Sequence, residues 1–224
     1  MRVLIIAPEV STLSALLTAD EIDAIAPNHD TDVITGVVTQ ARITMRVSSQ
    51  HYDVIHFVAH GDETGVALSD GTMAPEDILQ LARHTRTKLV FFNACKSTIP
   101  GQFLIDTGVP AAIVHNKEAI DKNALRLATY FYAELATNGG DLRGAYYQTN
   151  PRDGSLSWLS NGNYRDHAAE AILAELQAVK DSAEEREQVQ RRLEMWLLRL
   201  AFVAGGNLLV SLAFVIYWIT TRYL

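Results

Sequence analysis

The chain has 224 residues and 48% of them are hydrophobic, which is enough for one sizeable folded domain with an appendage. Its formal net charge of -7 and its pI near 5.5 argue against nonspecific binding to nucleic acid, which needs a basic surface. Cys95 is the only cysteine, which excludes an intramolecular disulfide and a zinc site built from several cysteines, and fits a reducing compartment.

The first half of the chain predicts strands that alternate with helices. Apolar, β-branched runs predict strands over residues 3–7, 32–39 and 54–59, and helices are expected over residues 14–25 and 40–49 between them. A short hairpin is expected over residues 66–71, because Asp70-Gly71 favours a tight turn. A helix over residues 74–84 follows, with Pro75 in its first turn.

The second half continues this alternation up to residue 164. Strands are expected over residues 88–93 and 111–115, followed by a helix over residues 121–137 with Asp121 as its N-cap. A short helix over residues 139–150 and an edge strand over residues 156–164 close the domain. Strands that are apolar on both faces and alternate with helices predict an α/β fold, with a mostly parallel sheet that helices cover on both sides.

The composition changes after the predicted domain, residues 1–164. Residues 165–199 are rich in Ala, Glu, Gln and Arg and contain neither Gly nor Pro, which predicts a long helical stalk. Apolar residues follow a 3–4 spacing over Ile172, Leu176 and Val179, but Arg186 and Gln190 interrupt the seam. A coiled coil is therefore one alternative for this segment, and a single exposed helix is the other.

Residues 200–220 predict a transmembrane helix, with a buried core helix as the alternative. They include no charged side chain, and as a helix they would be about 31 Å long, close to the roughly 30 Å of a bilayer core. Three arginines precede the segment and only Arg222 lies in the short tail, residues 221–224, which favours a C-terminal single-pass anchor with the domain on the cytoplasmic side. Gly205-Gly206 and Asn207 favour a helix–helix contact, and so a homo-oligomer formed through the stalk and this helix.

Two reactive residues follow two of the predicted strands. His60 comes after strand 54–59 and Cys95 after strand 88–93, and the carboxyl ends of parallel strands share the edge of the sheet where ligand sites form. A cysteine attacks a carbonyl as its thiolate, and a neighbouring histidine can take the proton. Gly61 lacks a Cβ, so its N–H can approach a substrate closely and form an oxyanion hole with the N–H of Cys95. A lone cysteine at a strand end is also common as an inert buried residue, and the spacing by itself leaves both readings open.

The remaining polar residues near these strand ends are weaker candidates. A His-x-x-x-His pair such as His56 and His60 suggests zinc on a helix, but on a strand the two lie roughly 13 Å apart. We therefore expect no metal site, no cofactor, and a core position for His56. The candidates for a substrate pocket are the following: Asp62, His115, Asn116 and Asp121. Asp62, with Glu63 and Asp70, would favour a basic substrate side chain or orient the imidazole of His60. Ordinary structural roles explain the same candidates: a solvated loop for the acidic residues, a strand end for His115 and Asn116, and a helix cap for Asp121.

The two motifs also resemble a known family. Residues 56–61 (His-Phe-Val-Ala-His-Gly) and 90–97 (Val-Phe-Phe-Asn-Ala-Cys-Lys-Ser) resemble the histidine and cysteine motifs of the CHAT proteins, bacterial relatives of caspases and separases. The resemblance continues through residues 107–113 and into helix 121–137, and covers residues 54–150 well. It departs from the caspase signature Gln-Ala-Cys-x-Gly, since Asn93 replaces the glutamine and Ser97 the glycine, which leaves the substrate preference open.

The resemblance implies a caspase-like three-layer α/β sandwich over residues 1–164 and cysteine endopeptidase activity, with Cys95 as nucleophile and His60 as general base and acid. It also implies a protein substrate, an activating partner, and a role in bacterial defence or regulated death. Together with residues 200–220, this predicts a membrane-tethered protease. The alternative is a catalytically inactive module that recruits or oligomerises partners at the membrane.

Overall fold

The computed structural model describes residues 1–118, 121–149, 155–162, 191–192, 195 and 216–218. The chain divides into two units, residues 1–167 and 168–224, and the elements described below belong to the first. The predicted stalk, residues 165–199, the predicted transmembrane segment, residues 200–220, and the tail lie outside the described residues apart from the few named above. In the described part of the chain, no helix has both the length and the apolar character needed to cross a membrane.

Six of the described strands form one sheet, in the order β2-β1-β3-β7-β8-β9. Their bounds are β1 Arg2–Pro8, β2 Asp30–Gly36, β3 Val54–Val58, β7 Leu89–Asn93, β8 Ala111–His115 and β9 Leu156–Ser160. The first five run parallel, and β9 pairs antiparallel with β8. The predicted mostly parallel sheet and its closing edge strand are therefore confirmed.

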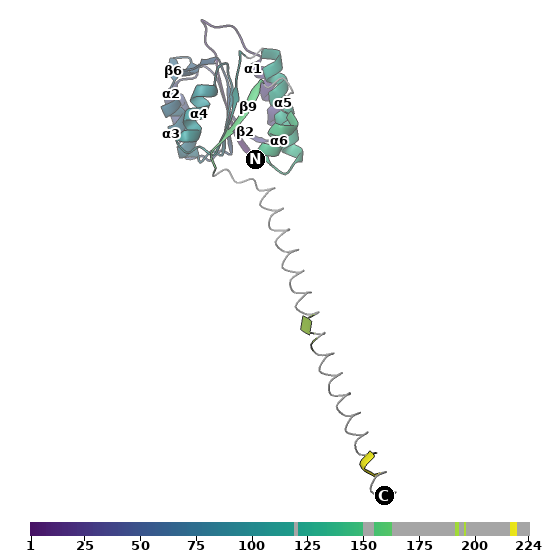
Figure 1. Cartoon of the computed structure of the whole chain (residues 1–224). Helices are drawn as coiled ribbons and strands as arrows, with labels where there is room; N and C mark the ends of the chain where they lie inside the picture. Colours follow the sequence, from purple (N-terminus) through teal and green to yellow (C-terminus); the bar gives the residue numbers. More distant parts are fainter. Residues whose placement is uncertain (119–120, 150–154, 163–190, 193–194, 196–215, 219–224) are drawn as a thin grey trace. The chain divides into compact units, whose positions relative to one another are not determined.

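Helices cover both faces of this sheet (Figure 1). One layer consists of α2 Gln40–Val47, α3 Pro75–Thr85 and α4 Thr98–Asp106, and the other of α1 Thr18–Ile25, α5 Asp121–Thr137 and α6 Leu142–Thr149, with a short turn η1 Ala26–Asn28 after α1. Successive residues of a strand point to opposite faces, so Leu4 of β1 packs with the α2–α4 layer and Ile5 with the α1, α5 and α6 layer. The three-layer sandwich predicted above is confirmed.

Two helices differ from the prediction. Helix α1 begins at Thr18 rather than at residue 14, and residues 9–17 form an exposed loop beyond the end of β1. Helix α4 was not predicted, because it contains Pro100 and Gly101, two residue types that disfavour helices. Pro100 lies in the first turn, where no N–H is needed. A Cβ on Gly101 would lie 2.3 Å from Val114 Cγ1, so only glycine lets α4 pack this closely against β8.

A small second sheet follows His60 directly. It consists of β4 Gly61–Asp62, β5 Gly65–Leu68 and β6 Gly71–Met73, all antiparallel. The predicted hairpin is therefore confirmed, and it gains a third strand. Gly65 has a φ of +145°, and a Cβ there would lie 2.2 Å from the carbonyl oxygen of Met73, so both the backbone conformation and the packing require glycine at this position.

Candidate active site

The ends of β3 and β7 lie side by side. The two strands pair in parallel, with Val58 opposite Asn93, and the Ala59 N–H donates to the carbonyl oxygen of Asn93 at 3.4 Å. Just beyond the strands, a Cβ on Gly61 would lie 3.1 Å from Ala94 Cβ and 3.4 Å from the carbonyl oxygen of Cys95. The His60-Gly61 and Ala94-Cys95 segments are therefore neighbours at the carboxyl edge of the sheet.

The ring of His60 is held by the loop that follows β1. Nε2 of this half-buried histidine lies 2.8 Å from the backbone carbonyl oxygen of Ser14. A carbonyl oxygen only accepts, so the contact selects the tautomer with its proton on Nε2 and its lone pair on Nδ1. Ser14 was not among the predicted site residues, because every residue has a backbone carbonyl and the sequence gives no sign of which one will contact His60. Its role follows only from where the loop lies.

Cys95 is half-buried and precedes a strained turn. Lys96 has a φ of +50°, a left-handed conformation that side chains other than glycine adopt at a cost of about 1–2 kcal/mol. Ser97 follows, is buried, and accepts a hydrogen bond from the N–H of His115 through Oγ at 3.0 Å. This bond to β8 fixes the path of the chain from β7 through Cys95 into α4.

The backbone N–H of Gly61 points away from its neighbouring strand. The Ala67 N–H donates to the carbonyl oxygen of His60 at 2.8 Å, which makes these two residues a hydrogen-bonded pair of the antiparallel ladder. Such pairs alternate with non-hydrogen-bonded ones. Gly61, opposite Val66, is therefore a non-hydrogen-bonded position, and its N–H is not used by β5.

Two of the residues predicted to line a pocket lie at the surface. Asp62 is exposed and accepts from Thr64 Oγ1 at 2.6 Å and from the Thr64 N–H at 2.7 Å, which holds the pKa of its carboxyl below the usual range. Asn116 is exposed as well, and donates through Nδ2 to Ser157 Oγ at 2.7 Å.

Asp121 and His115 have structural contacts instead. Asp121 is the first residue of α5 and accepts the N–H of Leu17 at 3.0 Å, so its carboxylate links α5 to the start of α1. His115 is only 2% exposed and turns its Nε2 to Asn93 Oδ1 at 2.9 Å. His115 is the last residue of β8, and its burial favours the alternative of an ordinary polar residue at a strand end.

His56 is fully buried, which confirms its predicted core position. Its Nε2 lies 2.6 Å from Oε1 of Glu21, a buried residue of α1 that the sequence reading did not single out. No group of three or more His, Cys, Asp or Glu side chains suited to holding a metal ion occurs among the residues that the structure describes.

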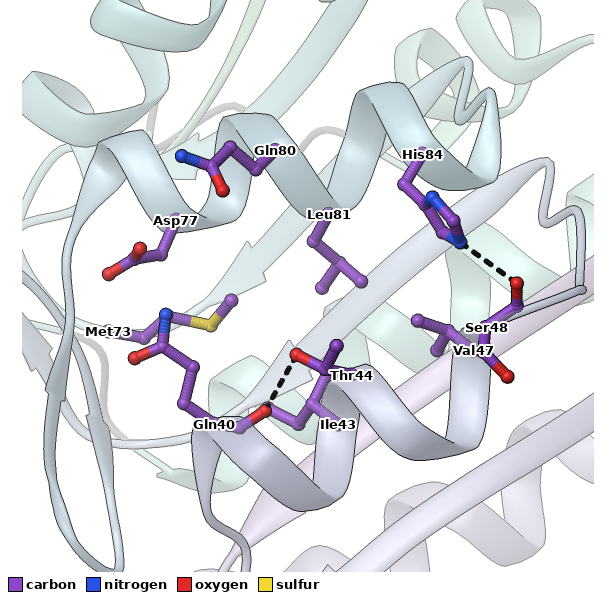
Figure 2. A pocket seen from close by; sticks show the side chains of 10 residues that line it. All are labelled: Gln40, Ile43, Thr44, Val47, Ser48, Met73, Asp77, Gln80, Leu81 and His84. Carbon is purple, nitrogen blue, oxygen red and sulfur yellow. Dashed lines mark hydrogen bonds between the residues drawn. The ribbon is translucent and has the colours of Figure 1, made fainter.

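A cavity of about 320 Å³ lies between α2 and α3 (Figure 2). Its lining includes Ile43, Val47 and Leu81, with Asp77 toward one end and His84 toward the other. None of the predicted site residues lines it. We therefore place the candidate active site at the carboxyl edge of the sheet and not in this cavity.

The comparisons with known proteins agree with this fold. The structure is similar to the Arg-specific cysteine proteinase gingipain R, with a TM-score of 0.52 and 14% identity over 74% of this chain and 47% of that one. The chain thus spans about half of the gingipain. Two further structures have TM-scores too low to support an argument. They are a radical S-adenosylmethionine methyltransferase from Kitasatospora setae (0.34; 15% identity; 64% of this chain, 27% of that one) and pyridoxal kinase from Staphylococcus aureus (0.33; 13%; 66% and 84%).

The search of curated proteins found no match. The family profile of the CHAT domain, in contrast, matches residues 7–149, well over half of the chain, and this range includes both the His60-Gly61 and the Ala94-Cys95 segments. With its caspase-like, mostly parallel α/β sandwich, this chain belongs to the CHAT domain family.

Proposed function

We propose that this chain is a cysteine endopeptidase that cleaves a protein partner, with Cys95 as the nucleophile and His60 as general base and then general acid. The observation that carries the proposal is the pairing of β3 with β7, which brings His60-Gly61 next to Ala94-Cys95. The Ser14 carbonyl supports it, since a proton held on Nε2 leaves the Nδ1 lone pair of His60 to accept a thiol proton.

The reaction proceeds in two halves. His60 takes the thiol proton, Sγ of Cys95 bonds to the scissile carbonyl carbon, and the carbonyl electrons move onto oxygen, where the N–H groups of Gly61 and Cys95 stabilise the negative charge. The C–N bond then breaks, and His60 returns the proton to the leaving amine. In the second half, His60 takes a proton from a water molecule whose oxygen bonds to the thioester carbon; the C–S bond then breaks, His60 returns the proton to Sγ, and the acid product leaves.

The proposed surroundings of this site follow from the sequence. Asp62 and Asn116 are exposed beyond the strand ends and form the rim of the substrate site in this proposal. Residues 165–199 and 200–220 tether the peptidase to a membrane as a stalk and anchor, and pair it with further copies. An activating partner and a role in bacterial defence complete the proposal. Full-length protein recovered in the soluble fraction without detergent would contradict the tether.

The decisive experiment is cleavage of a candidate protein partner, chosen from the products of neighbouring genes. Cys95→Ala and His60→Ala should each reduce cleavage roughly 10³-fold or more, as expected for the loss of a nucleophile or its base. His84→Ala is the matched control, because His84 is exposed on α3 beside the cavity and should leave cleavage unchanged. Unaltered cleavage by Cys95→Ala would reject the nucleophile, and a full biological effect of that variant would favour the inactive binding module.

A further inference from the structure

A buried carboxylate on α1 touches both strands that carry the proposed dyad. Glu21 is 2% exposed. Its Oε1 lies 2.6 Å from Nε2 of His56 on β3, and its two oxygens lie 2.7 and 2.9 Å from Nδ2 of Asn93 on β7. His56 lies four residues before His60, and Asn93 lies two residues before Cys95. One side chain thus links the middle of β3 to the end of β7 from the side of α1.

The partners of Glu21 are an amide and an imidazole rather than a lysine or arginine. Nδ1 of His56 is buried and has no hydrogen-bond partner among the described residues, and the ring packs edge-on against Phe91 and Tyr132 with centroids 4.6 and 5.4 Å away. The tautomer with its proton on Nε2 satisfies Glu21 and leaves only a lone pair, not an N–H, at this apolar position.

The contacts continue from Glu21 to the other side of Cys95. Since Nδ2 of Asn93 donates to the carboxylate, its Oδ1 is left to accept from Nε2 of His115 at 2.9 Å. The N–H of His115 in turn donates to Ser97 Oγ. Asn93 and Ser97 lie two residues before and two residues after Cys95. The chain of hydrogen bonds that begins at Glu21 therefore holds both flanks of the nucleophile.

Helix α1 also follows the loop that orients the histidine. The Ser14 carbonyl that accepts from His60 lies four residues before α1, and α1 is held in place by Glu21. Buried hydrogen-bond networks rigidify the elements they join when every donor is satisfied. Here those elements are the strand of His60, the strand of Cys95 and the helix behind the Ser14 loop.

We infer that Glu21 is a positioning residue for the dyad: through His56 in the middle of β3 and Asn93 at the end of β7 it holds the two strands together, and so sets His60 and Cys95 relative to each other. This inference rests on the proposed function, since it presupposes that the two side chains act together. Glu21 itself touches no reacting atom and acts only through its two partners.

The test measures how fast iodoacetamide alkylates Cys95 in the full chain as a function of pH, which needs no known substrate. Because the chain has one cysteine, the reaction reports on this thiol alone. Coupling to His60 makes the profile differ between wild type and His60→Ala. Glu21→Gln keeps the size of the side chain but sets an amide N–H₂ against that of Asn93. We expect the alkylation profile of Glu21→Gln to shift by about one pH unit toward that of His60→Ala. A shift of this size changes the alkylation rate at neutral pH about tenfold.

A control and a double-mutant cycle separate positioning from general destabilisation. Thr85→Val removes a buried hydroxyl of α3 that bonds Leu81 and Thr87 and has no link to the strand ends, so its profile should match wild type. Asn93→Ala should shift the profile in the same direction as Glu21→Gln, and the double variant should shift it by less than the sum of the two single shifts, because part of the effect of Glu21 passes through Asn93. Asn93→Ala also serves should Glu21→Gln not fold.

The outcomes distinguish this inference from the proposed function. If His60→Ala leaves the alkylation profile unchanged, the dyad is rejected and the inference falls with it. If His60→Ala shifts the profile while folded Glu21→Gln and Asn93→Ala both match wild type, the dyad stands and the positioning role is overturned. Additive shifts in the double variant would likewise overturn it.

Discussion

The two edges of the central sheet hold carboxylates in opposite ways. At the amino edge each carboxylate meets a cation near solvent: Asp32 lies 2.8 Å from Arg2 Nη2, and Asp53 lies 2.8 Å from Lys88 Nζ. At the carboxyl edge Glu21 is buried with an amide and an imidazole for partners. The same functional group is thus solvated and paired at one edge, and enclosed at the other.

This difference predicts different consequences of mutation. Near solvent, a group that loses its partner is rehydrated, and an exposed ion pair contributes little. In the interior, a donor that loses its acceptor stays unsatisfied and costs about 1–3 kcal/mol. The amino edge should therefore tolerate substitutions, while the carboxyl edge should couple stability to the geometry of His60 and Cys95.

The largest effect is expected at Glu21. Glu21→Ala leaves the His56 and Asn93 donors buried without an acceptor and should lower the free energy of unfolding by about 3–5 kcal/mol, as measured by urea denaturation of the full chain. Asp32→Ala is the matched carboxylate at the other edge and should lose less than about 2 kcal/mol. Equal losses of stability in the two variants would contradict the proposed difference between the two edges.

The next effect concerns the hairpin that follows His60. Gly65→Ala adds a Cβ that meets the Met73 carbonyl in a backbone conformation that favours glycine, and should cost about 2–3 kcal/mol in the free energy of unfolding. Gly71→Ala has a similar φ of +148° but open space around the Cβ, and should cost about 1 kcal/mol. Because β5 binds the His60 carbonyl, Gly65→Ala should also slow alkylation of Cys95. A larger loss from Gly71→Ala would contradict this account.

A smaller and pH-dependent effect is expected at Tyr52 on the amino edge. Burial, with the hydrogen bond that Tyr52 donates to Asp32, raises its pKa from 10 to about 12. Since the folded-state pKa lies above the ordinary one, this contribution is fully present below pH 10 and is lost as the pH rises through 12. Tyr52→Phe should be about 1 kcal/mol less stable at pH 7.

The pH series supplies the check on Tyr52. In urea denaturation between pH 10 and 12, wild type should lose more stability than Tyr52→Phe, because the variant has no phenol to ionise at this position. Tyr130→Phe is the control, since Tyr130 is 56% exposed on α5 and should keep the wild-type slope. Parallel slopes for wild type and Tyr52→Phe would show that the buried phenol does not couple to folding.

The smallest effect is expected at Lys88. Lys88 forms an ion pair with Asp53, and the two side chains are 52% and 28% exposed. Lys88→Ala should therefore lower the free energy of unfolding by only about 0.2–1 kcal/mol. The loss should shrink further in 1 M salt, where the Debye length is about 3 Å. Lys122→Ala, at an exposed position of α5, gives the baseline. A loss of several kcal/mol that does not depend on salt would contradict the difference between the two edges, because the ion pair would then contribute as much as a buried contact.

Much of the fold follows from local patterns. The bounds of β8 and α5 agree with the prediction, because a short apolar run and a long amphipathic segment each have a clear period. Helix α4 was missed since its first turn contains Pro100 and Gly101, two residues that locally disfavour helices, while its close packing on β8 requires the glycine. Tertiary contact overrode propensity there.

The sequence by itself determined that His60-Gly61 and Cys95 lie at one edge of the sheet, because parallel strands joined by helices bring their carboxyl ends together. Only the tertiary structure decided what holds them. The Ser14 carbonyl has no signature in a sequence, and Glu21 reaches Asn93 across 72 positions of the chain. A carboxylate on a short amphipathic helix looks like a surface residue until the packing of α1 on the sheet encloses it.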